Sequence, residues 1–241
     1  IKNSYRELVS NIDMFPIEEL NVENFSVLEN RKIITPNQFM FYPKGQYSIL
    51  TARGCVFRCT YCAHNYLTKI YERKKDLRKR SIPHLIKELK SVTSLYDNIK
   101  RIWFDDDSFL IRTTEEIKLF AELYKKEIDM PFTCLAIPKN IQKNKIEFLV
   151  SAGMDNIQFG IESTTPRILK LYKRPCSKED VLESTLTVKE VNNGKVFIHY
   201  DLILDNPWET DRERMDCLNF LKSLPRPYII SYFSLVFYPG V

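Results

Sequence analysis

The stretch Cys55-Val56-Phe57-Arg58-Cys59-Thr60-Tyr61-Cys62 places three cysteines at i, i+4 and i+7, directly after the short apolar run Ile49-Leu50-Thr51. A loop of this length can wrap so that three thiolates converge on one metal centre. Closed structural zinc sites take four ligands, and ferredoxin clusters take four cysteines. Three thiolates on a [4Fe–4S] cluster would leave one iron open, as a catalytic metal requires. The spacing alone also fits half a zinc site or three unrelated buried thiols.

The composition describes a globular chain of 241 residues, 44% of them hydrophobic, which suffices for one α/β barrel-sized domain or two small ones. No apolar run approaches the roughly 20 residues of a membrane span. Six cysteines are too few for a disulfide-dense secreted module, which indicates a reducing cytoplasmic location. The net charge of +5 permits an anionic partner without requiring one. Because the chain starts at Ile1 without a signal peptide pattern, we expect it to be a segment of a longer protein.

Two parts of the chain differ in their patterning. Residues 1–46 are irregular, and we interpret them as a linker that follows an upstream domain and leads into a larger body. Across residues 47–241, apolar strands alternate with amphipathic helices, which predicts right-handed βαβ units and a parallel sheet. The expected strands cover residues 47–51, 99–104, 132–137, 156–161, 195–204 and 228–236. Helix starts are expected at Ser81, at Thr113 with Glu116, at Ser177 with Asp180 and at Thr210 with Glu213, and one helix end at Gly153.

Six such units predict an α/β fold with a parallel (β/α)6 partial barrel of the TIM type. Function in these barrels sits at the C-terminal ends of the strands. That rule places the cysteine loop, residues 105–107, Glu162-Ser163 and Asp205-Asn206 around one mouth. The alternative is an open doubly wound sheet, but no Gly-rich phosphate turn follows the first strand.

Several motifs in order resemble radical S-adenosylmethionine enzymes, in the branch whose members usually carry a cobalamin-binding domain ahead of the radical domain. The cysteine spacing with an aromatic residue at Tyr61 is similar to the cluster loop of that family. The other motifs that carry the resemblance are Arg53-Gly54-Cys55, Phe104-Asp105-Asp106-Asp107-Ser108-Phe109, Gly160-Ile161-Glu162-Ser163, Asp201-Leu202-Ile203-Leu204, Pro207-Trp208-Glu209-Thr210 and Tyr238-Pro239-Gly240.

The sequence departs from that pattern in two respects. Asp205 and Trp208 stand where the family often has glycine, so the contact with the adenine is expected to differ there. The Asp-x-His-x-x-Gly cobalamin motif is absent, and none of the three histidines (His64, His84 and His199) sits in one. Cobalamin is therefore expected only through an upstream domain.

The resemblance implies that Cys55, Cys59 and Cys62 hold a [4Fe–4S] cluster whose fourth iron is chelated by S-adenosylmethionine (SAM). Reductive cleavage of SAM would then give a 5′-deoxyadenosyl radical that attacks an unknown substrate. In the full-length protein this chemistry would serve a cobalamin-dependent methyl transfer or a ring-forming reaction. The implied electron donor is a protein such as flavodoxin or ferredoxin.

The resemblance also assigns cofactor-binding roles, while the catalytic residues stay unknown. Tyr61 would lie beside the adenine, and Asp105 and Asp106 beside the methionine amino group. Glu162 and Ser163 would bind the ribose or the methionine end. The alternatives are a packed aromatic for Tyr61, a solvated acidic turn for the aspartates, and helix capping for Glu162 and Ser163.

The remaining chemical groups have simpler interpretations. We expect His199 to be a buried, hydrogen-bonded residue of the barrel interior. Cys134, Cys176 and Cys217 are interpreted as small buried hydrophobic residues. The basic run at residues 73–80 is a solvated loop or a surface for an anionic substrate. Because no aromatic residues interleave with it, nucleic acid is not the expected partner.

Two other functions remain open. An RNA-modifying methylthiotransferase of the same superfamily would need a further cluster domain and an RNA-binding tail, and the sequence shows neither. A non-catalytic iron–sulfur or zinc module would use the same cysteines without cleaving SAM.

Overall fold

The computed structural model describes residues 4–17, 21–34, 44–71, 77–191 and 195–237. A curved sheet at its centre is built from β3 (Gln46–Ile49), β6 (Arg101–Phe104), β7 (Phe132–Ala136), β8 (Met154–Glu162), β9 (Phe197–Ile203) and β10 (Tyr228–Phe233). The strands are all parallel and lie in the order β10–β9–β8–β7–β6–β3. Each strand pairs with the next one along the chain, without the reversal of order that marks a doubly wound sheet. The predicted six-stranded partial barrel is confirmed.

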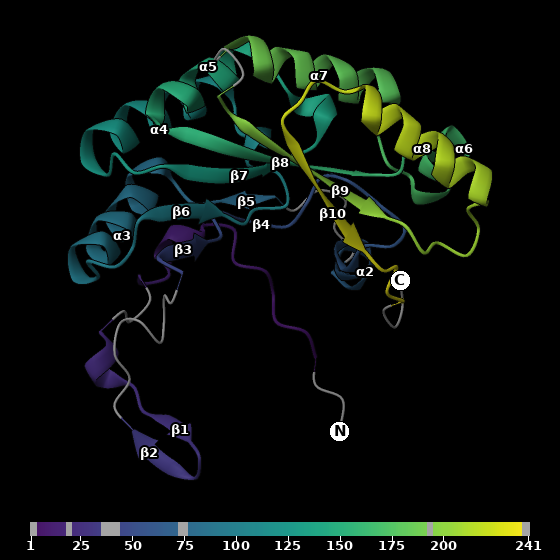
Figure 1. The fold of residues 1–241 in the computed structure, drawn as a ribbon. Helices are drawn as coiled ribbons and strands as arrows, with labels where there is room; N and C mark the ends of the chain where they lie inside the picture. Colours follow the sequence, from purple (N-terminus) through teal and green to yellow (C-terminus); the bar gives the residue numbers. More distant parts are fainter. Residues whose placement is uncertain (1–3, 18–20, 35–43, 72–76, 192–194, 238–241) are drawn as a thin grey trace.

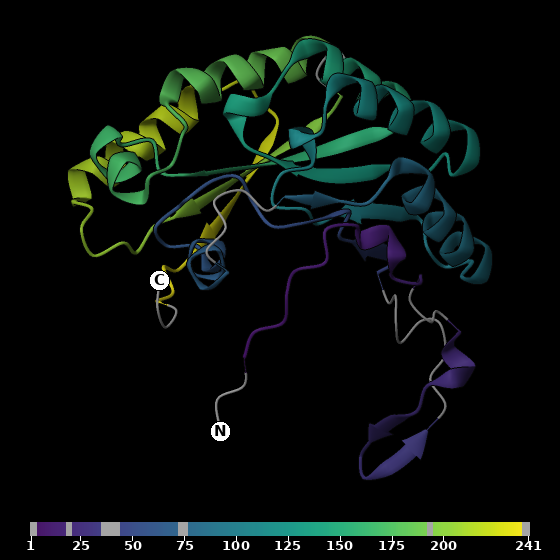
Figure 2. The same ribbon diagram turned by 180° about the vertical axis from the view of Figure 1, so that it is seen from behind.

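Helices cover the convex face of the sheet and leave its concave face open (Figures 1 and 2). They are α3 (Ile82–Leu95), α4 (Thr114–Glu127), α5 (Lys143–Ala152), α6 (Pro166–Tyr172), α7 (Lys178–Val191) and α8 (Asp211–Ser223). The predicted caps are present: Thr113 with Glu116 and Thr210 with Glu213 form capping boxes, and Ser81 caps α3. Gly153 ends α5 in the left-handed region at φ 116°, where glycine is favoured. Short 3-10 turns occur at Ile12–Met14, Val22–Asn24, Phe109–Ile111 and Pro138–Asn140.

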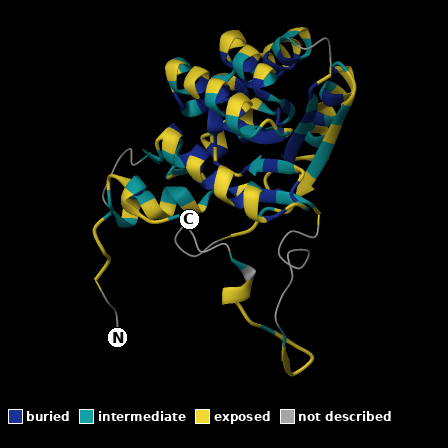
Figure 3. Cartoon of the chain, turned by 90° about the vertical axis from the view of Figure 1, so that its left-hand side faces the viewer, coloured by how far each residue is buried: buried dark blue, intermediate teal, exposed yellow. Residues whose placement is uncertain are grey.

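The core lies between the sheet and this helical layer, as the buried residues in Figure 3 show. On the β6 side it is a cluster of rings with centroids 4.9–6.0 Å apart, mostly edge to face. Its members, all 1% exposed or less, are Phe104, Phe109, Phe120, Tyr124 and Phe132. The cluster fixes the end of β6, immediately before the three consecutive aspartates.

The expectation that residues 1–46 are irregular is wrong for one segment. Strands β1 (Val27–Glu29) and β2 (Lys32–Ile34) form an antiparallel hairpin. Asn30 and Arg31 turn the chain with φ values of 48° and 63°, as a two-residue hairpin turn with both residues left-handed requires. The hairpin projects away from the sheet (Figure 1).

Some expectations fall on parts of the chain that the structure does not describe. They are the motif Tyr238-Pro239-Gly240 and the first half of the basic run. None of the helices in the described ranges has both the length and the apolar character needed to cross a membrane.

Candidate functional site

The cysteine loop leaves the C-terminal end of β3 and is held from both sides. Its first residues form β4 (Ala52–Arg53), which pairs antiparallel with β5 (Arg78–Lys79). On the far side, Thr60 donates a backbone hydrogen bond to Tyr172 O at 2.9 Å and a hydroxyl hydrogen bond to Leu171 O at 2.9 Å. The loop ends at Cys62, where α2 (Ala63–Ile70) begins. The cysteines are thus carried between two anchored ends.

All three loop thiols are free and line one cavity of about 180 Å³ at the strand ends. The cavity walls combine loop residues with residues of β7, β8 and β9 and with residues that follow β6 and α6. The charged or titratable groups facing it are Cys55, Cys59, Cys62, Tyr61, His64, Asp107, Glu162, Arg174 and Asp201. The structure therefore brings Tyr61 and Glu162 to the cysteines, as the sequence predicts. It adds His64, Asp107, Arg174 and Asp201, which the predicted set of cofactor-binding residues lacked.

Two of the loop thiols, Cys55 and Cys62, hold their protons more tightly than a free cysteine does. Burial raises the pKa of Cys55 to about 11 and raises that of Cys62, and the carboxylate of Asp107 adds to both shifts. A metal would have to displace these protons. Among the described residues, no three Cys, His, Asp or Glu side chains are assembled around the position of a single ion. Since each cysteine of a [4Fe–4S] cluster binds a different iron, its thiols lie further apart than the ligands of one ion, and this donor set fits the cluster.

Arg174 is the cation of the site. It follows α6, its side chain is 8% exposed, and its Nη1 donates to the sulfur of Cys59 at 3.5 Å. Its Nη2 donates to Gly160 O and lies 3.8 Å from Glu162 Oε1. A Cβ on Gly160 would come within 2.7 Å of Nη2, so only glycine permits this approach. Sequence reasoning missed Arg174, whose only signal was a basic residue just after a helix.

The backbone of Glu162 directs its side chain into the cavity. The residue ends β8 with φ 64°, at an irregularity in the pairing with β9 between Gly160 and Glu162. Non-glycine residues in the left-handed region are strained, and such strain clusters at functional sites. Burial raises the pKa of Glu162 to about 7, against the opposing effect of Arg174. The carboxyl group therefore titrates near neutral pH.

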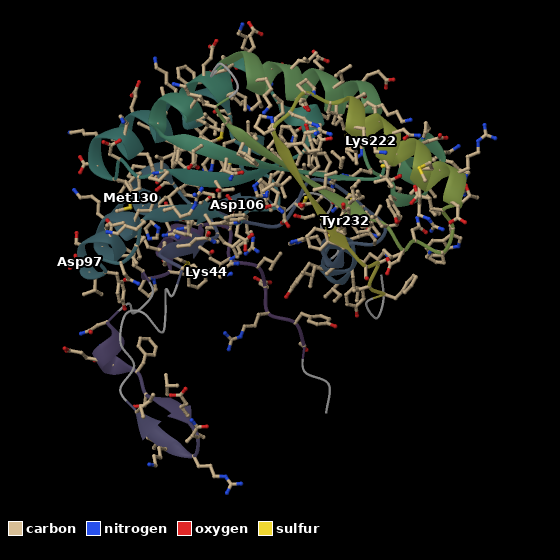
Figure 4. All side chains as sticks on the ribbon, viewed as in Figure 1. Lys44, Asp97, Asp106, Met130, Lys222 and Tyr232 are labelled. Atoms are coloured by element: carbon tan, nitrogen blue, oxygen red, sulfur yellow. The ribbon has the colours of Figure 1, made fainter. Side chains whose placement is uncertain are left out.

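The three consecutive aspartates point in different directions. Asp105 is exposed, whereas Asp107 faces the cysteine cavity and lies 2.9 Å from His64 Nε2. Asp106 lies at the end of β6, where Figure 4 labels it, and its carboxylate accepts from Thr51 N at 2.6 Å and Ala52 N at 2.9 Å. The sequence predicts Asp105 and Asp106 as cofactor-binding residues, but neither of their carboxylates lines the cysteine cavity. The aspartate that lines it is Asp107.

Asp106 belongs to a buried clamp on the first residues of the cysteine loop. The hydroxyl of Thr51 donates to Asp106 Oδ2 and accepts from Arg112 Nη2 at 3.0 Å. Arg112, which is 1% exposed, also donates to Thr51 O at 3.0 Å and to Arg80 O at 3.2 Å. Burial raises the pKa of Asp106 despite its hydrogen bonds. The clamp thus holds β4 and its partner strand β5 together, and it fixes the start of the cysteine loop.

Ser163 does not line the cavity. Its hydroxyl donates to Glu209 Oε1 at 2.9 Å and accepts from Thr165 N at 3.1 Å, close to the start of α6. These contacts agree with the alternative role of Ser163, which is a structural one near the start of a helix. A contact with SAM stays a prediction for Ser163, as it does for Tyr61, Asp105, Asp106 and Glu162.

Tyr61 separates the cysteine cavity from a second, mainly apolar cavity of about 280 Å³. Its ring packs edge to face on Tyr172 with centroids 4.9 Å apart. Trp208, one of the two residues in place of glycine, lines this second cavity beside Phe237. The other, Asp205, accepts a hydrogen bond from Leu235 N at 2.6 Å and so holds the segment after β10. Both departures from the family pattern thus have local contacts.

The remaining candidates are structural. Cys134, Cys176 and Cys217 are buried, as predicted. The expectation for His199 is wrong, because it is only half-buried and makes no hydrogen bond within the described ranges, its ring lying 6.0 Å from that of Phe197. The buried polar groups on that strand are Tyr200, whose hydroxyl lies 2.6 Å from Thr185 Oγ1, and Asp201, which accepts from Gln158 Nε2 at 2.6 Å.

Comparison with known proteins identifies a family for this chain and solved structures with a similar fold. The profile of the Radical SAM superfamily matches residues 49–221. The uncharacterized methyltransferase PH0819 of Pyrococcus horikoshii is 26% identical over 195 residues, which are 80% of this chain and 40% of that protein. The chain thus spans less than half of this relative.

Two solved structures are of the radical SAM methyltransferase TsrM from Kitasatospora setae. The structure with tryptophan and a SAM analog superimposes with a TM-score of 0.66 at 17% identity, over 90% of this chain and 40% of that one. The structure with cobalamin and a [4Fe–4S] cluster gives 0.62 at 14% identity, over 87% and 43%. At these identities the similarity establishes the fold.

Proposed function

Because the chain belongs to the radical SAM superfamily, we propose that it binds a [4Fe–4S] cluster through Cys55, Cys59 and Cys62 and cleaves SAM reductively. The observation that carries this proposal is the cavity lined by three free thiols together with the buried Arg174 and the carboxyl groups of Asp107, Glu162 and Asp201. The family uses a [4Fe–4S] cluster and SAM, which supply one-electron cleavage of the sulfonium to methionine and a 5′-deoxyadenosyl radical. The protein supplies binding, orientation and exclusion of water.

The charges in the cavity suit both parts of that cofactor set. Arg174 lies beside Cys59 and offsets the negative charge that a thiolate-ligated cluster brings. Glu162 and Asp107 face the same space and suit the ammonium and sulfonium charges of SAM. The apolar cavity behind Tyr61 suits a flat base, so we place the adenine on that side.

Anaerobic reconstitution with iron and sulfide tests the proposal. We expect about four irons per chain, because the thiols hold a [4Fe–4S] cluster. After reduction in the presence of SAM, 5′-deoxyadenosine should appear in chromatography. A full cluster without 5′-deoxyadenosine would overturn the catalytic assignment. Zinc at about one per chain, without cleavage, would instead support a structural module.

We expect SAM affinity to weaken as the pH falls below about 7 in the cluster-loaded protein. Glu162 has a pKa raised to about 7, so it is anionic above that pH and neutral below it. Below that pH the neutral carboxyl group no longer attracts the cationic SAM, and the affinity falls by up to about tenfold per pH unit. Titration calorimetry at several pH values from about 5.5 to 8 measures how SAM affinity changes as Glu162 titrates.

Glu162→Gln should remove most of the pH dependence and bind weakly throughout. The matched control is Glu213→Gln, because Arg167 lowers the pKa of Glu213 to about 2 and keeps it ionised over the whole range. An affinity that does not change with pH in the wild type would exclude Glu162 from the SAM site.

For the whole protein we propose cobalamin-dependent methyl transfer. The support is the methyltransferase relative and the TsrM structure that holds both cobalamin and a cluster. We propose that residues 1–46 link an upstream cobalamin domain to the barrel of residues 47–241, and that a cytoplasmic flavodoxin or ferredoxin supplies the electron. Transfer of a labelled methyl group from SAM by the full-length protein with cobalamin tests this, and no transfer with a competent cluster would refute it.

A further inference from the structure

A further cavity lined by described residues lies outside the cysteine site, along the outer side of edge strand β3. Its volume is about 640 Å³. One wall is apolar and comes mainly from the N-terminal segment, with Ile12, Phe15 and Ile17. The basic residues of the cavity include Arg53 of β4 and Arg78 of β5, and the ion pair of Arg80 with Glu88 also lines it.

Arg53 and Arg78 are directly opposite each other in the β4–β5 pair, and both line the cavity. Opposed residues of an antiparallel pair carry their side chains on the same face, with β-carbons about 4.5–5.5 Å apart, and like charges there are destabilising. An anion bound between the two guanidinium groups would offset this repulsion and stabilise the protein.

The neighbouring cations are already neutralised. Lys79 Nζ lies 2.5 Å from Glu116 Oε2, and Arg80 Nη2 lies 2.6 Å from Glu88 Oε2. Within the described ranges, no carboxylate pairs with Arg53 or Arg78. Arg78 donates to Val9 O at 3.0 Å, and its buried Nε has no hydrogen-bond partner among these residues. Arg78 is therefore a cation of the basic run that lines the cavity and has an unused donor.

We propose that this cavity binds the phosphate group of a phosphorylated substrate between the guanidinium groups of Arg53 and Arg78. Two opposed guanidinium forks supply two positive charges and paired donors, which match a phosphate dianion. A single carboxylate would leave one of the charges uncompensated. The apolar wall would receive the rest of the molecule.

The position of Arg53 links this site to the cysteine loop, since Arg53 is two residues ahead of Cys55. This role as a substrate anchor rests on the proposed function, because only a radical enzyme would act on a molecule held beside the cluster loop. The clamp of Asp106 and Arg112 on Thr51 and Ala52 holds the strand that carries Arg53. The anchor and the loop therefore share one rigid support.

Calorimetric titration of the cluster-loaded protein with inorganic pyrophosphate tests the site. We expect Arg53→Gln and Arg78→Gln each to weaken binding about tenfold or more, as loss of a charged hydrogen-bonding partner does. Arg212→Gln removes the same charge from an exposed residue of α8 and should change the affinity less than about twofold. Acetate, as the carboxylate probe, should bind far more weakly.

Thermal unfolding gives a second measurement that does not depend on activity. Without phosphate, Arg53→Gln should leave the midpoint unchanged or raise it, because it removes a like-charge contact. Added phosphate should raise the midpoint of the wild type and not that of Arg53→Gln, since only the wild type binds the anion. A lower midpoint of Arg53→Gln in phosphate-free buffer would show a structural role and overturn the proposal.

Other outcomes separate this proposal from the proposed function. A wild-type protein that forms 5′-deoxyadenosine but does not bind pyrophosphate overturns the phosphate site alone. Equal weakening by Arg212→Gln, or equal binding of acetate, overturns it as well. Pyrophosphate binding without SAM cleavage supports the site and refutes the radical function.

Discussion

Replacing Cys55, Cys59 or Cys62 individually with alanine is expected to abolish both the cluster and the formation of 5′-deoxyadenosine. The three thiols line one cavity, and each supplies the only protein ligand to one iron in the proposed arrangement. Loss of any one exposes a second iron and leaves two attachment points. Iron content should fall from about four per chain towards zero, as measured after anaerobic reconstitution and gel filtration.

The chain offers three matched controls in Cys134, Cys176 and Cys217, which are also free but lie apart from the cavity. Alanine at these positions removes a buried sulfur and should cost about 1 kcal/mol of stability while iron content is retained. A cluster that survives replacement of Cys59, or that depends equally on Cys134, would contradict the assignment. Far-ultraviolet circular dichroism of each variant shows whether the barrel is still folded.

The fold could be predicted from the sequence because local signals repeat along it. Each strand is a short apolar run, and each helix after it begins at a capping residue whose contact the structure contains, such as Thr113 with Glu116. Chirality and short connections then leave a parallel sheet as the consistent arrangement. The hairpin at Asn30-Arg31 was missed, although an asparagine between two apolar pairs is a turn signal.

The site was predictable in its cysteines and less so in its charges. A spacing of three cysteines is local information, whereas the contact of Arg174 with Cys59 joins residues 115 positions apart. The side chains of Asp105, Asp106 and Asp107 differ in direction because β6 ends there and the chain turns, which sequence periodicity does not encode. Such orientations follow from tertiary packing.

That difference in direction predicts that adjacent aspartates respond differently to the same substitution. Asp106→Asn should destabilise the protein by about 3 kcal/mol, because an amide group replaces one of the oxygens that accept from Thr51 and Ala52. The remaining amide oxygen can still accept from the two backbone N–H groups, so the loss falls on the buried Thr51 hydroxyl, whose acceptor becomes a donor. Arg112 would also lose a compensating charge. Urea unfolding measures the difference.

Asp105→Asn is the matched control, with the same chemical change one residue earlier. Its side chain is exposed, and its hydrogen bond to Ile49 O comes from the backbone N–H, which the substitution leaves in place. The expected change is within about 0.5 kcal/mol. Because the clamp holds the start of the cysteine loop, Asp106→Asn should also lower iron content after reconstitution while Asp105→Asn does not. Equal effects at the two positions would show that the clamp does not support the loop.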